Sequence, residues 1–175
     1  MREILRKYPK CEFGRELFPG NPIPILRVSG GKTTADVADW GYLTQKGKRV
    51  YNARSETLLE KPLFGKDFVQ NRCVIPVTGF CEWDGDGTGW DFLPQEEEML
   101  YLAGVCRKKT EGWEATVVTE HASGCVGEIH HRTPLILSGE NLRQWLYDEA
   151  LARQFLEEAK ERVLLKRKKM EGETL

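Results

Sequence analysis

The sequence has no long apolar run, no Cys-x-x-Cys pair and almost no net charge. A membrane-spanning helix needs about 20 consecutive apolar residues, and no stretch approaches that length. The chain opens with MREILRKYPK, which is charged throughout and unlike a secretory signal peptide. We therefore expect a cytoplasmic protein that does not enter a membrane.

The cysteines favour neither a disulfide framework nor a zinc site. Their number is odd, no two are spaced as a metal-binding pair, and reduced thiols are the simpler interpretation. They are Cys11, Cys73, Cys81, Cys106 and Cys125. We expect no metal and no cofactor. The formal net charge is −1, so a site for an anionic partner would have to be a local feature.

The residues that are present indicate one domain with a β-rich core. The 175 residues are 40% hydrophobic and 30% charged, the balance of an ordinary globular domain over residues 1–175. Alternating and β-branched runs predict short strands, with a turn at 85–89. The expected strands are 23–28, 33–37, 49–52, 72–83, 100–108, 113–122 and 131–138, with 100–108 and 113–122 as a hairpin.

Apolar residues at helical spacing predict helices over 2–8, 57–71 and 140–170. Ser55 is expected to cap the second helix, and Pro62 to kink or break it. Residues 166–175 are predicted to form a basic, frayed tail. The whole pattern predicts an α+β fold, a single domain with a mostly antiparallel, barrel-like sheet flanked by helices.

Four places carry polar groups in unusual surroundings: Asn52–Glu56, Glu82, Thr119–His121 and His130–Arg132. From Asn52 to Glu56, an amide, a guanidinium, a hydroxyl and a carboxylate cluster where a strand meets a helix. Such a cluster either satisfies the local backbone or faces a ligand. Glu82 ends an apolar strand beside Phe80 and Trp83, where burial would raise its pKa toward acid–base catalysis. A solvated or arginine-paired carboxylate is the alternative.

His130 and His131 are neighbours in the sequence. On an extended segment their side chains would point to opposite faces, so they would not bind one metal together. One of them would face a site, where it could shuttle a proton, and the other would face solvent. A satisfied structural histidine is the alternative.

Arg54 and Arg132 carry guanidinium groups, which suit phosphate oxygens. Ion pairs with Glu56 or Glu82 are the alternative for both. Trp40 lies in the stretch DWGYL, where it could stack on a nucleobase or belong to the core.

Three stretches then occur in a specific order: NARSET at 52–57, RCVIPVTGFCEW at 72–83, and VVTEHA leading to IHHRTPLIL at 117–137. Together they resemble the SOS response-associated peptidase (SRAP) family, the abasic-site processing proteins. The family's usual wording is Asn-Ala-Arg-x-Glu-Thr, then Gly-Phe-Tyr-Glu-Trp, then Ile-His-x-Arg-Met-Pro. DWGYL is also similar to the family's Arg-Trp-Gly-Leu. Three ordered motifs are far more specific than one.

The resemblance implies a monomeric protein of the DNA damage (SOS) response that binds single-stranded DNA and traps abasic sites covalently, with lyase-type or self-peptidase activity. In the family, the amine of an N-terminal cysteine forms a Schiff base with the ring-opened sugar, and its thiol closes a thiazolidine. By motif, Asn52 would orient the nucleophile, Glu82 would transfer protons, and His130 would assist proton transfer and reversal. The DNA contacts would come from Trp40, Arg54, Ser55, Thr119 and Arg132.

The chain departs from the family at its start, since it begins Met-Arg-Glu and not Met-Cys-Gly-Arg. We expect the family's opening strand to be missing and crosslinking by this polypeptide to be impaired, either because the sequence starts late or because the chain is a variant that binds DNA without the ring closure. Cys81 replaces the family's tyrosine. Two rival functions stay open: a thiol peptidase or hydrolase that uses Cys81 or Cys125 with His130 and Glu82, and a non-catalytic binder of single-stranded DNA.

Overall fold

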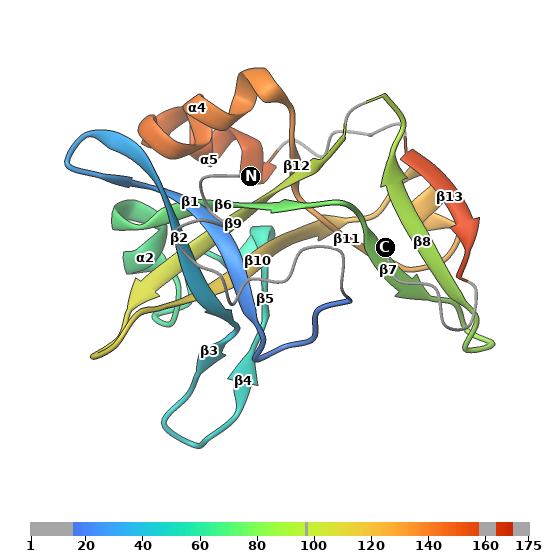
Figure 1. Ribbon diagram of the computed structural model, residues 1–175, viewed down its shortest axis with the longest axis horizontal. Helices are drawn as coiled ribbons and strands as arrows, with labels where there is room; N and C mark the ends of the chain where they lie inside the picture. Colours follow the sequence, from blue (N-terminus) through green and yellow to red (C-terminus); the bar gives the residue numbers. More distant parts are fainter. Residues whose placement is uncertain (1–15, 97, 158–163, 170–175) are drawn as a thin grey trace.

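The computed structural model describes residues 16–96, 98–157 and 164–169 (Figure 1). A mixed sheet closes into a ring, helices pack against it, and a smaller sheet lies beside it. The prediction of an α+β fold with a barrel-like core is therefore confirmed. The helix predicted over 2–8 lies outside the described residues. Among the described helices, none is long and apolar enough to cross a membrane.

Five strands form the ring in the order β10, β2, β1, β6, β9 and back to β10. They are β1 (Pro22–Ser29), β2 (Lys32–Trp40), β6 (Arg72–Val77), β9 (Leu100–Lys108) and β10 (Trp113–His121). Neighbours run antiparallel except β10 and β2, which are parallel. The predicted hairpin of 100–108 and 113–122 is the β9–β10 pair.

Three short strands attach to the ring: β5 (Asn52–Arg54) and β11 (Arg132–Pro134) pair with β10, and β12 (Ile136–Leu137) pairs with β9. Leu135 donates its N–H to Val118 O and accepts a hydrogen bond from the Ala103 N–H, each at 2.8 Å, so this segment inserts between β9 and β10. In the register of β10, Val117 lies opposite Asn52, Thr119 opposite Arg54, and His121 opposite Arg132; those three partners are predicted site residues.

Alternation along the strands divides the core into two layers. On β6, Cys73 and Ile75 face the inside of the ring, whereas Val74 faces the helices. β9 and β10 follow the same rule. Gly104 lies at a crowded point of the ring, where an added Cβ would come within 3.0 Å of the Cys73 Sγ atom. A small residue is required there because the strands approach so closely.

The helices cover the outer layer of the core. They are η1 (Ser55–Thr57), α2 (Gly65–Gln70), α3 (Gly124–Gly127), α4 (Gly139–Tyr147) and α5 (Glu149–Glu157). Trp145 of α4 is fully buried, and its Nε1 donates to Cys73 O at 2.9 Å. The indole therefore joins α4 to β6 by packing and by a satisfied hydrogen bond.

A second sheet and a hairpin complete the described fold. The sheet has the order β13 (Leu164–Lys168), β8 (Gly89–Pro94) and β7 (Phe80–Trp83). The hairpin consists of β3 (Tyr42–Leu43) and β4 (Arg49–Val50), and it projects from the body of the molecule (Figure 1). The predicted turn at 85–89 joins β7 to β8.

Several boundaries differ from the sequence-based expectation. The helix over 57–71 is wrong in extent: only η1 and α2 are helical, and Pro62, which has no N–H to donate, lies between them. Ser55 therefore starts a short 3₁₀ turn and caps no long helix. The expected strand 72–83 is two strands, β6 and β7, in different sheets, and the strand 49–52 divides at Tyr51.

The C-terminal expectation is also wrong. The helix predicted over 140–170 is divided between α4 and α5, which ends at Glu157. Leu164–Lys168 forms β13, antiparallel to β8, and Arg167 lies opposite Asp91. Residues 166–169 are thus an ordered edge of the small sheet and not a frayed tail, because cross-strand pairing outweighs the local helical spacing.

Candidate functional site

A cavity of about 670 Å³ lies between the segment before β1, the ends of β2 and β6, and strand β7. Seven of the eight predicted site residues line it: Trp40, Asn52, Arg54, Glu82, Thr119, His130 and Arg132. Ser55 does not line it and is buried at the start of η1. The amide, the carboxylate and the imidazole of the three predicted catalytic residues therefore come from distant parts of the chain to one cavity.

Glu82 and His130 form the polar contact at the centre of this site. The Glu82 Oε2 atom lies 3.6 Å from Nδ1 of His130, and both side chains are about one-quarter to one-third exposed. Burial raises the pKa of Glu82, and a charged His130 opposes that rise. The carboxyl group therefore keeps its proton to a higher pH than a solvated glutamate does.

His130 is held in place by the backbone that follows it. Its N–H donates to Val126 O at 2.9 Å, which continues the turn after α3. Its Nδ1 lies 3.2 Å from the Arg132 N–H nitrogen and 3.0 Å from Arg132 O. These contacts fix the ring beside Glu82.

His131 is exposed, as predicted for one of the two histidines, but its ring does not point away from that of His130. The two imidazole rings lie 4.5 Å apart between centroids at an angle of 49°, and both line the cavity. The expectation was wrong because β11 begins only at Arg132, so the alternation of an extended strand does not apply to the histidines.

Arg132 is bound to Glu56 by a two-pronged ion pair. Its Nη1 and Nη2 donate to the two Glu56 oxygens at 2.6 and 3.0 Å, and Nη2 also donates to Thr119 O at 2.6 Å. The hydrogen bonds from Arg132 lower the pKa of Glu56. His121 approaches Glu56 from outside, at 3.2 Å. The ion pair that the sequence left open for Arg132 is therefore present, with Glu56 as partner.

Arg54 has a different environment. It is exposed on β5, next to Ala53, which is buried in the core. Asn52, two residues earlier, is exposed on the same face of that strand and also lines the cavity. The alternation along β5 thus turns the amide and a guanidinium together toward the cavity.

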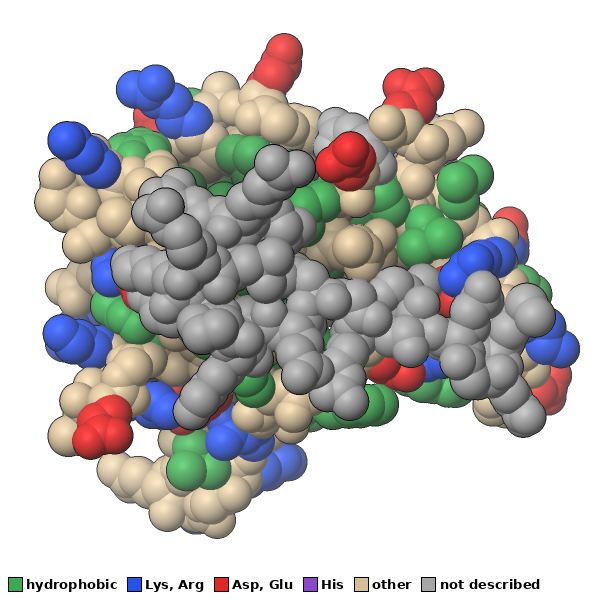
Figure 2. All heavy atoms as spheres, viewed as in Figure 1, with side chains coloured by type: hydrophobic (Ala, Val, Ile, Leu, Met, Phe, Trp, Pro, Cys, Tyr) green, Lys and Arg blue, Asp and Glu red, His purple; other side chains and the backbone are tan. Residues whose placement is uncertain are grey.

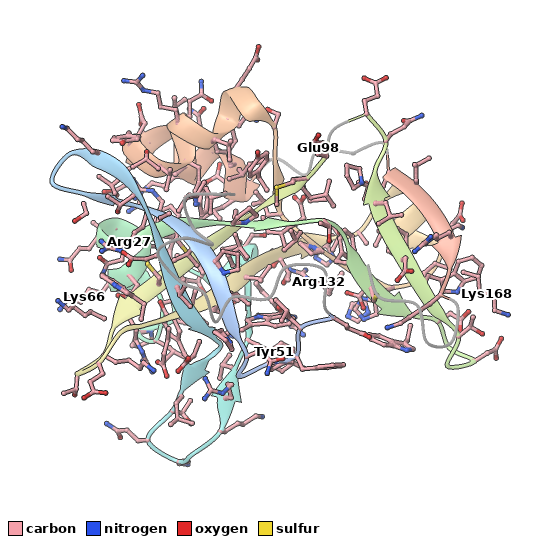
Figure 3. All side chains as sticks on the ribbon, in the orientation of Figure 1. Arg27, Tyr51, Lys66, Glu98, Arg132 and Lys168 are labelled. Carbon is pink, nitrogen blue, oxygen red and sulfur yellow. The ribbon has the colours of Figure 1, made fainter. Side chains whose placement is uncertain are left out.

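Aromatic side chains form much of the cavity rim. Trp40 donates from Nε1 to Tyr51 O at 3.2 Å and meets the Tyr51 ring edge to face, 6.1 Å between centroids. Tyr51, Trp83 and Phe18 are each roughly half exposed. Figure 3 shows Tyr51 and Arg132 on the elements that border the cavity. Neither Phe18 nor Tyr51 was predicted as a site residue from the sequence. The signal for Tyr51 was its position directly before Asn52.

Cys81 is also on the cavity wall, but its thiol is engaged. Its Sγ donates to Oδ1 of Asp91 at 2.8 Å, and Asp91 is only 1% exposed. Arg167 approaches the other Asp91 oxygen at 3.4 Å. Burial and the Asp91 carboxylate raise the pKa of Cys81 to about 12. A thiol in this state is a poor nucleophile near neutral pH.

Within residues 16–96, 98–157 and 164–169, no three His, Cys, Asp or Glu side chains are grouped closely enough to hold a metal ion.

Comparison with known proteins places this arrangement in a family. A model of the family described as SOS response associated peptidase (SRAP) matches residues 7–171. The abasic site processing protein YoqW of Bacillus subtilis (strain 168) is 32% identical over 119 residues, which cover 63% of this chain and 53% of that protein. The abasic site processing protein HMCES of Gallus gallus is 34% identical over 124 residues, 54% of this chain and 37% of that protein. The chain thus spans about half the length of YoqW.

Solved structures share the fold. A phage-related protein of Bordetella bronchiseptica superposes with a TM-score of 0.73 at 19% identity, over 95% of this chain and 88% of that chain. A protein of Bacteroides thetaiotaomicron gives a TM-score of 0.63 at 23% identity, over 78% of this chain and 67% of that chain.

Proposed function

Because this chain belongs to the SOS response-associated peptidase family, we propose that it processes abasic sites in single-stranded DNA, with the ring-opened sugar held in the cavity. The observation that carries this proposal is the convergence of Asn52, Glu82 and His130 on one cavity, with Glu82 and His130 in contact at 3.6 Å. An abasic sugar carries no base, so its aldehyde carbon is not obstructed by one and can enter the cavity.

Glu82 is proposed as the proton donor and acceptor. An amine that adds to the aldehyde carbon gives a carbinolamine, and loss of water then forms the imine. The departing hydroxyl needs a proton, and a glutamic acid whose pKa is raised by burial keeps its proton to a higher pH and can supply it. The carboxylate that remains is stabilised by the His130 imidazole beside it.

His130 and Asn52 are proposed to set the geometry of that step. The Arg132 backbone occupies Nδ1 of His130, so Nε2 is the nitrogen proposed to face the substrate and return a proton when the imine is hydrolysed. The exposed amide of Asn52 offers a donor and an acceptor to the attacking amine and the sugar hydroxyls.

The flanking DNA is proposed to contact a set of residues around the opening. Arg54 is exposed and suited to direct contact with a phosphate. Arg132 already binds Glu56 and Thr119, so we propose that it contributes positive charge and orders this wall. Trp40 would pack near the DNA, and Ser55 would act through the backbone of η1.

The covalent product depends on the amine. A thiazolidine needs an amine and a thiol on neighbouring carbons of one residue, a requirement that an N-terminal cysteine meets and an internal cysteine does not. Cys73, Cys81, Cys106 and Cys125 are internal residues, so we propose that none of them closes such a ring.

Borohydride trapping tests the proposal. The protein is incubated with a single-stranded oligonucleotide that carries one abasic site, and the imine is reduced to a stable adduct. We expect E82Q and H130N to slow trapping by about 100-fold, the usual size of a lost acid–base group. E60Q, at an exposed glutamate that does not line the cavity, is the matched control. Equal trapping rates for all three variants would overturn the proposal.

A further inference from the structure

The hairpin β3–β4, with its turn, is a projecting arm of residues 41–51 (Figure 1). Both of its ends lie at the cavity: Trp40 precedes the arm, Tyr51 ends it and Asn52 follows, and all three residues line the cavity. The arm therefore leads outward from the rim of the proposed site on one side of it.

The arm is positively charged, although the chain as a whole is not. Between Trp40 and Ser55 the sequence has four cationic residues and no Asp or Glu: Lys46, Lys48, Arg49 and Arg54. Lys46 and Lys48 are exposed in the turn. Figure 2 shows Lys and Arg side chains gathered over this hairpin. By contrast, Lys109, Lys166 and Lys169 are each paired with a carboxylate.

Hydrogen bonds fix the turn at the tip. The Thr44 side chain donates to Lys48 O at 2.8 Å and accepts from the Lys48 N–H at 3.1 Å. Gly47 donates its N–H to Thr44 O at 2.9 Å and has a φ of 74°, a conformation that favours glycine. The two lysines therefore extend from a defined turn.

The base of the arm is anchored as well. Arg49 donates from Nη1 to Gly41 O at 2.7 Å, which ties the two strands together. The Leu43 N–H donates to Glu114 at 3.1 Å, and Arg107 donates to Leu43 O at 2.7 Å. A ligand that binds the arm thus meets a surface that is already ordered, so the protein loses little conformational entropy on binding.

An exposed aromatic ring lies at the base of this cationic arm. Tyr51 is 44% exposed at the base, and its ring is braced edge to face by Trp40. An exposed aromatic ring beside spaced lysines is the arrangement that binds single-stranded nucleic acid, by stacking a base and contacting the following phosphates.

We infer that the arm is a track for the single strand as it leaves the cavity, with Tyr51 stacking a flanking nucleobase and Lys46 and Lys48 contacting phosphates. The inference rests on the proposed function and adds a one-sided DNA contact to it. Lys46 and Lys48 lie in the turn at the outer end of the arm, and Tyr51 lies at its base beside the cavity.

The test uses the double variant K46Q/K48Q and fluorescent single-stranded oligonucleotides. Loss of two phosphate contacts should reduce the slope of log K against log salt by about 1.4 and weaken binding about tenfold at 0.1 M salt. K32Q/K66Q removes two exposed lysines that do not line the cavity and is the matched control. Y51A should weaken binding without changing the slope, because a stacked ring carries no charge.

Oligonucleotides with the lesion at one end locate the contact. One probe carries eight nucleotides on the 5′ side only, and the other carries eight on the 3′ side only. K46Q/K48Q should weaken one probe and leave the other unchanged, because the arm lies on one side of the cavity. Equal losses on both probes, or a salt slope equal to that of K32Q/K66Q, would overturn the inference.

The same variants separate this inference from the proposed function. An intact oligonucleotide of the same length has no aldehyde, so its binding reports on the DNA contacts without the covalent chemistry. If the proposed function fails, E82Q no longer affects trapping but K46Q/K48Q still lowers the salt slope. If the arm inference fails, the salt slope stays unchanged while trapping still depends on Glu82.

Discussion

The carboxylate of Glu82 lies 3.6 Å from Nδ1 of His130, although 47 residues separate the two in the chain. Glu82 comes from the small sheet and His130 from the turn that leads into β11. The contact therefore forms only when the small sheet and the ring are assembled, and it links the chemistry of the cavity to the packing of two sheets.

The raised pKa of Glu82 predicts a pH-dependent stability. The folded protein binds this proton more tightly than the unfolded chain does, so the free energy of unfolding falls as pH rises from about 4.5 through the raised pKa. The E82Q variant does not have this pH-dependent loss. Its advantage over the wild type across the interval amounts to about 1.4 kcal/mol of unfolding free energy for each unit of pKa shift. Urea unfolding at several pH values should show that the free energy of unfolding of E82Q rises relative to that of the wild type as pH increases across this interval. Curves of unfolding free energy against pH that run parallel for the two proteins would contradict this prediction.

The Glu56–Arg132 pair predicts a second stability effect. E56Q leaves the buried Arg132 guanidinium without its anionic partner, and we expect a loss of about 1–3 kcal/mol in the free energy of unfolding. E149Q breaks the exposed Glu149–Arg153 pair on α5 and should cost less than about 0.5 kcal/mol. Denaturant titration of both variants at pH 7 measures the difference, and equal losses would rule out a structural role for this pair.

Acid should act on the same pair. Arg132 holds the pKa of Glu56 below its usual value, so the stabilisation is present above the unfolded pKa and is lost as pH falls through the folded one. The wild type should therefore lose its advantage over E56Q on acidification below pH 4.5. An advantage that persists through this range would show that Glu56 acts without its charge.

The Cys81–Asp91 contact predicts an unreactive thiol. With a pKa of about 12, roughly one thiol in 10⁵ is ionised at pH 7. Alkylation of Cys81 by iodoacetamide at pH 8 should be much slower in the folded protein than in urea, as followed by peptide mass. D91N removes the negative charge that raises the pKa and should accelerate alkylation. Rapid alkylation of Cys81 in the wild type would instead support the thiol peptidase alternative.

Much of the fold could be predicted because its strands alternate. Residues 100–108 and 113–122 have the period of two that a half-buried strand requires, and they form β9 and β10. The ordered motifs likewise named Asn52, Glu82 and His130, which the structure brings to one cavity. In these places the local pattern and the tertiary environment agree.

The failures occurred where partners distant in sequence decide the conformation. Leu164–Lys168 continues a helical spacing, but its backbone pairs with β8 and Arg167 lies opposite the buried Asp91. Neither partner is visible from the residues around 164. The close approach of the His130 and His131 rings was missed because β11 begins at Arg132, after both histidines, so the alternation rule does not apply to them.

One strand sets the spacing of the site. Along β10, Val117 is opposite Asn52, Thr119 is opposite Arg54, and His121 is opposite Arg132. The spacing of residues along β10 therefore fixes the positions of groups that two other segments contribute. Loops between those segments can lengthen, shorten or exchange residues over evolutionary time without changing which residues pair with β10. A deletion inside β10, by contrast, would displace every one of them at once.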